Sequence, residues 1–294
     1  MVEAPLRRLR LVLHAGTPKT GTSALQRALY RHADDLERIG IWYPPADVDP
    51  VKKKHQYLVG LLLDGDEAAL RGRFDDIARA APPQTHTIVL STEGLFNHWW
   101  DYSATSKALL RDVTARFDVR IWTCFRPPVE FAVSQYAQLL RNPKQDAPAY
   151  GLDADLETML ENAWFAKRLD YAGYIREAEA AIGAGNVRAF RYGPDIVQRI
   201  FHALGAPEPE AEQVHPSLRA AGVALMRTVN RYDLPADEQH RAARLVLELD
   251  TLIGERAEAV RASPAAQRRI RELSAGSWEL IEAMTTGEGC EAVR

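Results

Sequence analysis

Cysteine is scarce in this chain. Cys124 and Cys290 are the only two among 294 residues, and one stands in an apolar stretch while the other lies near the C-terminus. Two isolated cysteines form neither a disulfide framework nor a cluster of metal ligands. We therefore expect no disulfide scaffold, no bound metal and a reducing, cytoplasmic setting.

Long apolar runs are also missing. The longest apolar cluster after the first predicted strand, Leu58 to Leu63, is far too short to cross a bilayer. Arg7, Arg8 and Arg10 precede an apolar run as in a signal peptide, but His14 interrupts that run before it turns into a glycine-containing loop. We expect neither a membrane span nor a signal peptide.

No charge of one sign dominates the chain. The 37 lysines and arginines nearly balance the 40 acidic residues, for a formal net charge of −3. Without a bulk basic field, nucleic acid is not an expected partner. The length suits one α/β unit with an appended helical region, although two domains remain possible. The composition says nothing of the oligomeric state.

What the chain does contain is a strand, a tight loop and a helix within residues 9–30. An apolar strand pattern is followed by a turn from Gly16 to Gly21, and Leu25 and Leu29 then lie on one helical face. Glycines let backbone N–H groups converge on an anion, and the helix N-terminus adds unpaired donors. This pattern predicts a phosphate-binding loop.

The position of the lysine distinguishes this loop from the nucleoside-triphosphate loop. Gly16 and Gly21 have the separation of that motif and Ser23 takes its final hydroxyl position. Thr22, however, occupies the usual lysine place, and Lys19 lies inside the loop instead. A cation there would lie over the bridging oxygen of a short anhydride.

The sequence PKTGTS in this loop resembles the 5′-phosphosulfate loop of the sulfotransferase family. The donor in that family is 3′-phosphoadenosine 5′-phosphosulfate (PAPS), and its product is 3′,5′-adenosine bisphosphate (PAP). The resemblance implies that the phosphosulfate is held by the loop, through Pro18, Lys19, Thr20, Gly21, Thr22 and Ser23. A strand-to-helix turn without a ligand is the alternative.

A candidate general base follows the next predicted strand, Thr87 to Leu90. Glu93 is expected beyond its carboxyl end, where ligands bind in open α/β sheets, and could accept the proton of an attacking hydroxyl. Cytosolic sulfotransferases resemble this segment but carry histidine in the place of Glu93, whereas several carbohydrate sulfotransferases use glutamate. His98 is a competing base, and a purely structural salt bridge or cap is the alternative for Glu93.

A second anion site is predicted at the end of the strand Val119 to Cys124. Arg126 stands at that end, and Ser134 follows eight residues later on a helix. A guanidinium matches a phosphate bidentately, and a hydroxyl adds a donor. The pair resembles the second sulfotransferase signature, which holds the donor 3′-phosphate. Alone, Arg126 could equally form a structural salt bridge.

The remaining donor contacts are predicted less directly. Tyr192, after the strand Asn186 to Tyr192, resembles the family's tyrosine near the adenine ring, with packing as the alternative. The family's late basic loop, which completes the 3′-phosphate site, has no copy here. Arg219, Arg268 or Arg269 are candidates to replace it.

Together these patterns predict a P-loop NTPase-like, three-layer α/β/α fold with a central parallel sheet of about five strands and a helical C-terminal part. We expect residues 1–205 to form the PAPS-binding domain and residues 206–294 to pack on it as helices. Residues 41–50 are predicted as a loop, a helix is predicted to begin at Lys52, and another to run from Ala265 to Met284.

The predicted function is transfer of a sulfuryl group from PAPS to an acceptor hydroxyl or amine, without a metal. The acceptor is not identified; the glutamate base and the aromatic residues Trp99, Trp100 and Tyr102 give a slight preference for carbohydrate. The segment Lys52–His55 is either a solvated helix start or part of an acceptor mouth. Two alternatives stay open: a P-loop small-molecule or nucleotide kinase, and a non-catalytic nucleotide-binding module.

Overall fold

The structure is a computed structural model that describes residues 8–45, 53–114, 116–144, 149–210 and 217–286. Its contacts divide the chain into two compact units. The sheet unit comprises Met1–Arg126, Ala172–Val214 and Glu279–Arg294, and the helical unit comprises Pro127–Tyr171 and His215–Trp278. We describe each unit by itself.

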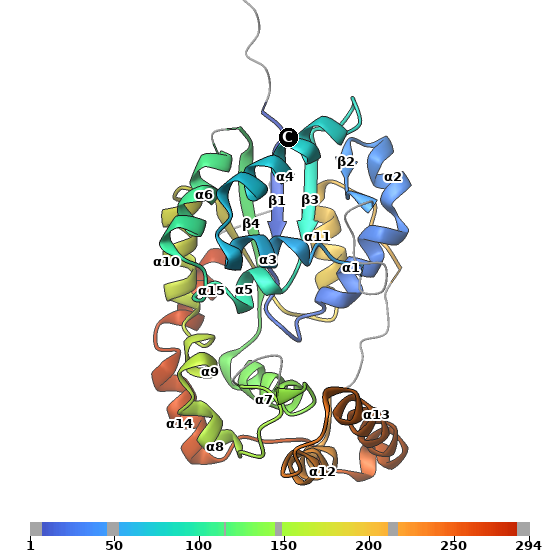
Figure 1. Cartoon of the computed structure of the whole chain (residues 1–294), viewed down its shortest axis with the longest axis vertical. Helices are drawn as coiled ribbons and strands as arrows, with labels where there is room; N and C mark the ends of the chain where they lie inside the picture. The colour runs from blue at the N-terminus through green and yellow to red at the C-terminus, as the bar shows by residue number, and fades with distance from the viewer. Residues whose placement is uncertain (1–7, 46–52, 115, 145–148, 211–216, 287–294) are drawn as a thin grey trace, which may run out of the picture. The chain divides into compact units, whose positions relative to one another are not determined.

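The sheet unit is built on a parallel sheet of five strands (Figure 1). In spatial order these are β2 (Ile41–Trp42), β3 (Thr87–Ser91), β1 (Arg10–His14), β4 (Asp118–Phe125) and β5 (Val187–Arg191). Each neighbouring pair is parallel, with β1 between β3 and β4. The predicted central parallel sheet is confirmed, and its middle strand is the one that leads into the glycine loop.

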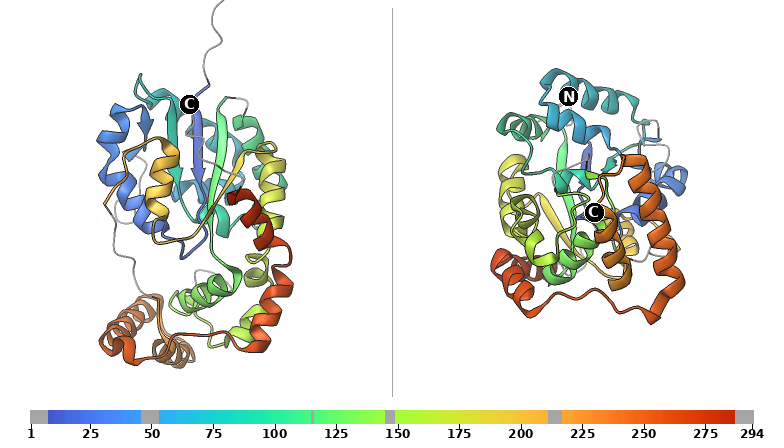
Figure 2. Two further views of the ribbon diagram at one scale, coloured as in Figure 1. Left: turned by 180° about the vertical axis from the view of Figure 1, so that it is seen from behind. Right: turned by 60° about the horizontal axis from the view of Figure 1, so that its bottom comes forward.

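Helices cover both faces of this sheet, and the view from behind shows α11 against the face opposite α3 and α4 (Figure 2). One face carries α1 (Thr22–Arg31), α2 (Ala33–Arg38) and α11 (Ile196–Leu204). The other face carries α3 (Tyr57–Asp64), α4 (Glu67–Ala80), α5 (Gly94–Asn97), α6 (Ala104–Thr114) and α10 (Tyr171–Ile182). The predicted three-layer α/β/α arrangement is therefore confirmed.

Alternation along the strands explains the two layers, because successive side chains point to opposite faces. Val12 lies beside Val89 in the sheet and packs with Leu25 and Leu29 of α1 in one buried cluster. Side chains at the intervening positions, such as Phe125, face the other layer, where the Phe125 ring packs 6.2 Å from that of Tyr174. Strands buried on both faces read as continuous apolar runs, as the centres of β1 and β3 do.

All five strands end at the same edge, and the predicted site residues follow those ends. The glycine loop follows β1, Glu93 follows β3, Arg126 follows β4 and Tyr192 follows β5. In open parallel sheets the carboxyl edge is the usual ligand side, since loops there are free of the sheet's own hydrogen bonds. The topology thus brings four separate sequence segments to one edge of the sheet unit.

The helical unit contains no strand among its described residues. Its helices α7 and α8 both contact α14, and α12 packs against α13. Their bounds, in chain order, are α7 (Pro128–Leu139), α8 (Leu156–Leu160), α9 (Ala163–Lys167), α12 (Ala220–Asn230), α13 (Ala236–Ile253), η3 (Gly254–Arg256) and α14 (Pro264–Leu273), followed by α15 (Ser277–Thr286), which runs from this unit into the sheet unit.

Three local predictions are wrong. Residues 41–50 were expected to form a loop, but Ile41 and Trp42 pair with Thr87 and Ile88 as a short edge strand. The helix expected from Lys52 begins only at Tyr57, and Lys52 itself lies outside the described residues. The single helix expected from Ala265 to Met284 is two helices.

The break between those two helices has a backbone cause. Gly276, which precedes α15, has a φ of 71°, in the left-handed region that stops a helix and that glycine adopts at little cost. The amide of Ser277 then donates to the Ser274 carbonyl, which closes the turn at 2.9 Å.

No helix in the described part of the chain combines the length and apolar character that a bilayer crossing needs.

Candidate anion-binding site

The backbone of the glycine loop is shaped as a nest for an anion. Positive φ angles at Lys19 (65°) and Gly21 (79°) flank Thr20, which has a negative φ, so the sign alternates through the loop. Such alternation turns successive N–H groups toward one point, and α1 begins directly after Gly21. A left-handed lysine costs about 1 kcal/mol or more, and such strain is typical of functional loops.

The loop is fixed to the neighbouring strand β4. The amide and the hydroxyl of Thr17 both donate to the Cys124 carbonyl, at 3.3 and 2.8 Å, and the Ala15 amide donates to the Trp122 carbonyl at 2.9 Å. The hydroxyl of Thr20 donates to the Thr17 carbonyl within the loop. The loop is therefore preorganised by the sheet, and the Thr20 hydroxyl hydrogen is already used.

Two features at the mouth of α1 fit an anion. The Thr22 hydroxyl is buried and has no hydrogen-bond partner, although a buried hydroxyl left unpaired is costly. A Cβ placed on Gly16 would lie 2.6 Å from that hydroxyl oxygen, so only glycine fits beside it. Ser23 is exposed and Pro18 is buried. A phosphate oxygen beside Thr22 would supply the hydrogen-bond acceptor that its hydroxyl lacks.

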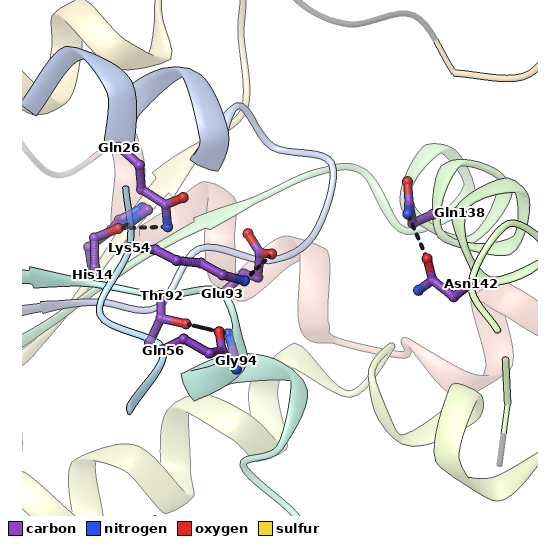
Figure 3. A network of polar contacts seen from close by, with 10 residues as sticks. His14, Gln26, Lys54, Gln56, Thr92, Glu93, Gly94, Gln138 and Asn142 are labelled. Carbon is purple, nitrogen blue, oxygen red and sulfur yellow. Dashed lines mark hydrogen bonds and ion pairs between the residues drawn. The ribbon is translucent and has the colours of Figure 1, made fainter. Parts of the chain in front are cut away.

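Glu93, the predicted base, forms an ion pair with Lys54. Lys54 Nζ lies 3.2 Å from Glu93 Oε1, and the lysine side chain is 10% exposed against 31% for the glutamate (Figure 3). Lys54 is therefore not part of a solvated helix start. Sequence reasoning weighed the segment Lys52–His55 only as a group and missed this pairing, because nothing in the local pattern places Lys54 beside a residue 39 positions later.

A buried polar network supports the carboxyl ends of β1 and β3. Ser91 Oγ lies 2.8 Å from His14 Nδ1 and accepts from Gln26 Nε2 at 3.2 Å, while the Ser91 amide donates to His55 Nδ1 at 3.0 Å. Burial lowers the pKa of His14 and of His55 to about 4 each. Both rings are therefore neutral near pH 7, which suits the acceptor role of His55 Nδ1.

Arg126 is tied to the glycine loop. Its Nη1 donates to the Lys19 carbonyl at 3.3 Å, and its guanidinium lies over the ring of Tyr192 at 4.3 Å from the centroid. The Tyr192 amide donates to the Phe125 carbonyl at 2.7 Å, which fixes that stack at the ends of β4 and β5. The structure thus brings Lys19, Arg126 and Tyr192 together.

Ser134 belongs to the helical unit, so its predicted pairing with Arg126 stays a prediction. It is buried on α7, and its Oγ lies 3.3 Å from that of Ser217. The arginines considered for the 3′-phosphate also lie in this unit. Arg219 donates to the Ala257 carbonyl at 3.1 Å, Arg269 pairs with Glu161 at 3.1 Å, and Arg268 is exposed.

The other residues considered near Glu93 have structural partners. His98 Nδ1 lies 3.1 Å from Asp101 Oδ2, so this competing base has its own carboxylate. Trp99 and Tyr102 are buried, and the Trp99 ring lies 5.4 Å from that of Tyr174. These two aromatic residues belong to the core of the sheet unit, which weakens the argument that they line an acceptor pocket.

Taken together, the edge of the sheet offers a nest of amides, a lysine and an arginine on one side and a carboxylate on the other. The nest and the cations suit a phosphorylated ligand, and the carboxylate suits proton transfer. No cluster of three or more histidine, cysteine or acidic side chains able to hold a metal ion occurs among the described residues.

Comparison with known proteins adds little to this description. No protein-family model and no curated protein sequence matches the chain. Among solved structures, a retinol dehydratase "in complex with androsterone and inactive cofactor PAP" aligns with 96% of this chain and 79% of its own. The identity is 15% and the TM-score 0.30, and at that score the likeness carries no argument. The α/β fold stands on the sheet topology.

Proposed function

We propose that this chain is a sulfotransferase that moves a sulfuryl group from PAPS to an acceptor hydroxyl or amine. The observation that supports it most is the anion cradle at the start of α1, where the unpaired Thr22 hydroxyl meets a nest that contains Lys19. A lysine inside the loop, with Thr22 in the usual lysine place, is the feature that the sulfotransferase resemblance rests on.

The donor fits the residues present and would supply the activated sulfuryl group. The loop residues Pro18–Ser23 would hold its phosphosulfate. Arg126, already bonded to the loop, would hold the 3′-phosphate with Ser134, and Tyr192 would lie near the adenine. An ordinary nucleoside triphosphate has no 3′-phosphate that would require this second site.

Within that assignment the chain's own residues have separate tasks. Glu93 takes the proton of the acceptor as the acceptor oxygen or nitrogen bonds to sulfur and the bond from sulfur to the phosphate oxygen breaks. Lys19 and the loop amides stabilise the negative charge that collects on the departing phosphate oxygen. Fixed donors are effective here because they need no reorganisation during the reaction.

Transfer can be tested directly with PAPS that carries a sulfur-35 label. The chain is incubated with acceptors of four kinds, a saccharide, a phenol, an amine and a peptide tyrosine, and labelled products are separated. We expect transfer to at least one kind, and we expect Glu93→Gln to lower the rate about 10²- to 10⁴-fold. Glu248→Gln, which changes an exposed glutamate of α13, is the control and should leave the rate unchanged.

The alternatives give different results in the same assay. Transfer of phosphate from labelled ATP with magnesium, but no transfer from PAPS, would show that the chain is a kinase and not a sulfotransferase. Binding of PAP without any transfer would instead indicate a non-catalytic module. The acceptor preference for carbohydrate rests on Glu93 and the partly buried Trp100, because Trp99 and Tyr102 are core residues.

A further inference from the structure

Lys54 is an unusual lysine, because only 8% of its surface is exposed. Lysine is almost never buried to this extent without a partner, since an unpaired ammonium loses its hydration. The partner here is Glu93, at 3.2 Å. Figure 3 shows the Lys54 side chain extended toward the Glu93 carboxylate. The pair therefore calls for an explanation in terms of the site.

The chain segment that carries Lys54 is held firmly against the end of β3. The His55 amide donates to the Ser91 carbonyl at 2.9 Å and the Ser91 amide donates to His55 Nδ1 at 3.0 Å. One residue further, the Thr92 hydroxyl donates to Gln56 Oε1 at 3.1 Å. Lys54 and Glu93 each stand next to these bonded residues, so the pair is set by backbone position and not by a loose side chain.

Lys53 and Lys54 are adjacent in the sequence, but their side chains contact different partners. Lys53 has a φ of 57°, a left-handed conformation that reverses the backbone direction at this point. Its ammonium lies over the ring of Tyr30 on α1, at 4.1 Å from the centroid, while Lys54 turns to Glu93. The Tyr43 hydroxyl donates to the Lys53 carbonyl at 2.7 Å and fixes the turn. The two lysines therefore form a natural pair for comparison.

We propose that Lys54 is a positioning residue for the general base, and that its ammonium holds the Glu93 carboxylate in one orientation. The inference rests on the proposed function, because Glu93 is the base only within that function. Lys54 would act through Glu93 and would not itself exchange a proton with the acceptor.

The geometry accounts for this role. A hydrogen bond between an ammonium and a carboxylate is charge-assisted, so it holds the carboxylate more firmly than a bond between neutral groups would. Lys54 occupies Oε1, and no described residue donates to Oε2, so the second oxygen is left for the proton of the acceptor. Two other groups near Glu93 have partners of their own. His98, directly after α5, pairs with Asp101, and the ammonium of Lys53 lies over the ring of Tyr30.

The test follows the Glu93 carboxylate itself at a single pH near neutrality. The full chain is labelled with carbon-13 at the side-chain carboxyl of glutamate, and the Glu93 resonance is assigned by its absence in Glu93→Gln. In Lys54→Met, which lacks the ammonium, this resonance should move toward the position of the exposed glutamates, because the charge-assisted hydrogen bond to Oε1 is gone. Lys53→Met is the matched control and should leave the resonance in place, and Lys54→Arg should return it most of the way to its wild-type position.

A second variant and a second measurement keep the outcome decisive. Lys54→Gln retains a hydrogen-bond donor without charge and replaces Lys54→Met should the latter fail to fold; the Glu93 resonance should move in this variant too. An unmoved Glu93 resonance in either variant overturns the role of Lys54. Calorimetric titration with PAP separates the role of Lys54 from the proposed function. The PAP dissociation constants of wild type and Lys54→Met should agree within about threefold. If wild type does not bind PAP, the sulfotransferase proposal is refuted, but the role of Lys54 in holding Glu93 is not.

Discussion

At the scale of single residues, the site depends on what is absent from Gly16 as much as on the side chains around it. Without a Cβ at this position, the Thr22 hydroxyl and the ring of His14 can approach the loop backbone from two sides. That hydroxyl is buried and has no hydrogen-bond partner. Gly16 therefore packs against both Thr22, at the start of α1, and His14, at the end of β1.

Gly16→Ala should damage both stability and anion binding. The added Cβ would lie 2.6 Å from Thr22 Oγ1 and 2.9 Å from His14 Cε1, closer than real Cβ contacts. Overpacking of this kind costs about 1–3 kcal/mol, so urea unfolding should show a loss of that size and PAP binding should weaken at least tenfold. Gly72→Ala, on α4 with nothing within 4 Å of the new methyl, is the control and should be neutral or stabilise by up to about 1 kcal/mol.

The two buried histidines predict a loss of stability in mild acid. His14 and His55 have an ordinary pKa of 6.5 that burial lowers to about 4. Between about pH 6.5 and pH 4 the two imidazoles are protonated in the unfolded chain but remain neutral in the folded chain. The free energy of unfolding therefore falls as the pH drops through this range and levels off below about pH 4. The fall is of the order of 3 kcal/mol for each ring, without full additivity because both bond to Ser91.

Urea unfolding between pH 4 and pH 7.5 measures this dependence. His14→Gln should flatten the curve between pH 4 and 6.5 although it lowers stability at pH 7. His240→Gln, which changes an exposed histidine, serves as the control and should leave the slope unaltered. If the free energy of unfolding of His14→Gln falls as steeply with pH as that of wild type, the His14 ring is not protonated on unfolding between pH 4 and 6.5.

At the scale of elements, the helical unit contains a helix start that is held by a buried aspartate. Asp250 of α13 is 5% exposed, and its two carboxylate oxygens accept from the Arg219 amide at 2.9 Å and the Gly222 amide at 3.1 Å. These amides lie at the N-terminus of α12, where backbone donors have no partner within the helix. The carboxylate also complements the positive end of that helix.

Asp250→Ala should therefore destabilise the chain by about 2 kcal/mol, because it removes a cap and leaves two buried amides unpaired. Asp250→Asn retains one acceptor and should lose roughly half as much. Urea unfolding of both variants checks the order, and Asp237→Ala, at an exposed position in the first turn of α13, provides the control. Equal stability of Asp250→Ala and wild type would show that water replaces the cap.

Sequence patterns predicted the elements of the sheet unit well where burial is two-sided. The strands around Val12 and Val89 contain continuous apolar runs, and the strand around Cys124 is apolar after its first residue except at Arg120 and Thr123. The strand Ile41–Trp42 was missed because two residues followed by Pro44 and Pro45 carry no periodic signal. Its pairing with β3 is a tertiary effect that no local pattern contains.

In the candidate site, too, local sequence patterns predicted some features, whereas features that depend on tertiary contacts were missed. Glycine spacing and residue order placed the loop, Glu93, Arg126 and Tyr192 at strand ends, since one parallel sheet aligns all its carboxyl ends. The burial of Lys54 and its pairing with Glu93 depend on contacts between distant segments, so local charge patterning favoured a solvated lysine. The roles of Glu93 and Ser134 are predictions that rest on the resemblance and await experiment.

At the scale of the whole molecule, a net charge of −3 is compatible with binding of a strongly anionic nucleotide. The positive potential is local and comes from Lys19, Arg126 and the N-terminus of α1, all within the sheet unit. Such a site is sensitive to ionic strength and to the loss of either cation. Its recognition of two separate phosphates is the central claim.

Calorimetric titration with PAP, beside adenosine 5′-phosphate and ATP with magnesium, tests that claim most directly. We expect PAP to bind best without magnesium. Lys19→Ala should weaken PAP and adenosine 5′-phosphate alike, whereas Arg126→Ala should weaken PAP at least tenfold and adenosine 5′-phosphate little. Arg244→Ala, at an exposed arginine of α13, is the control. Better binding of ATP with magnesium, together with no effect of Arg126→Ala, would contradict the sulfotransferase and favour the kinase.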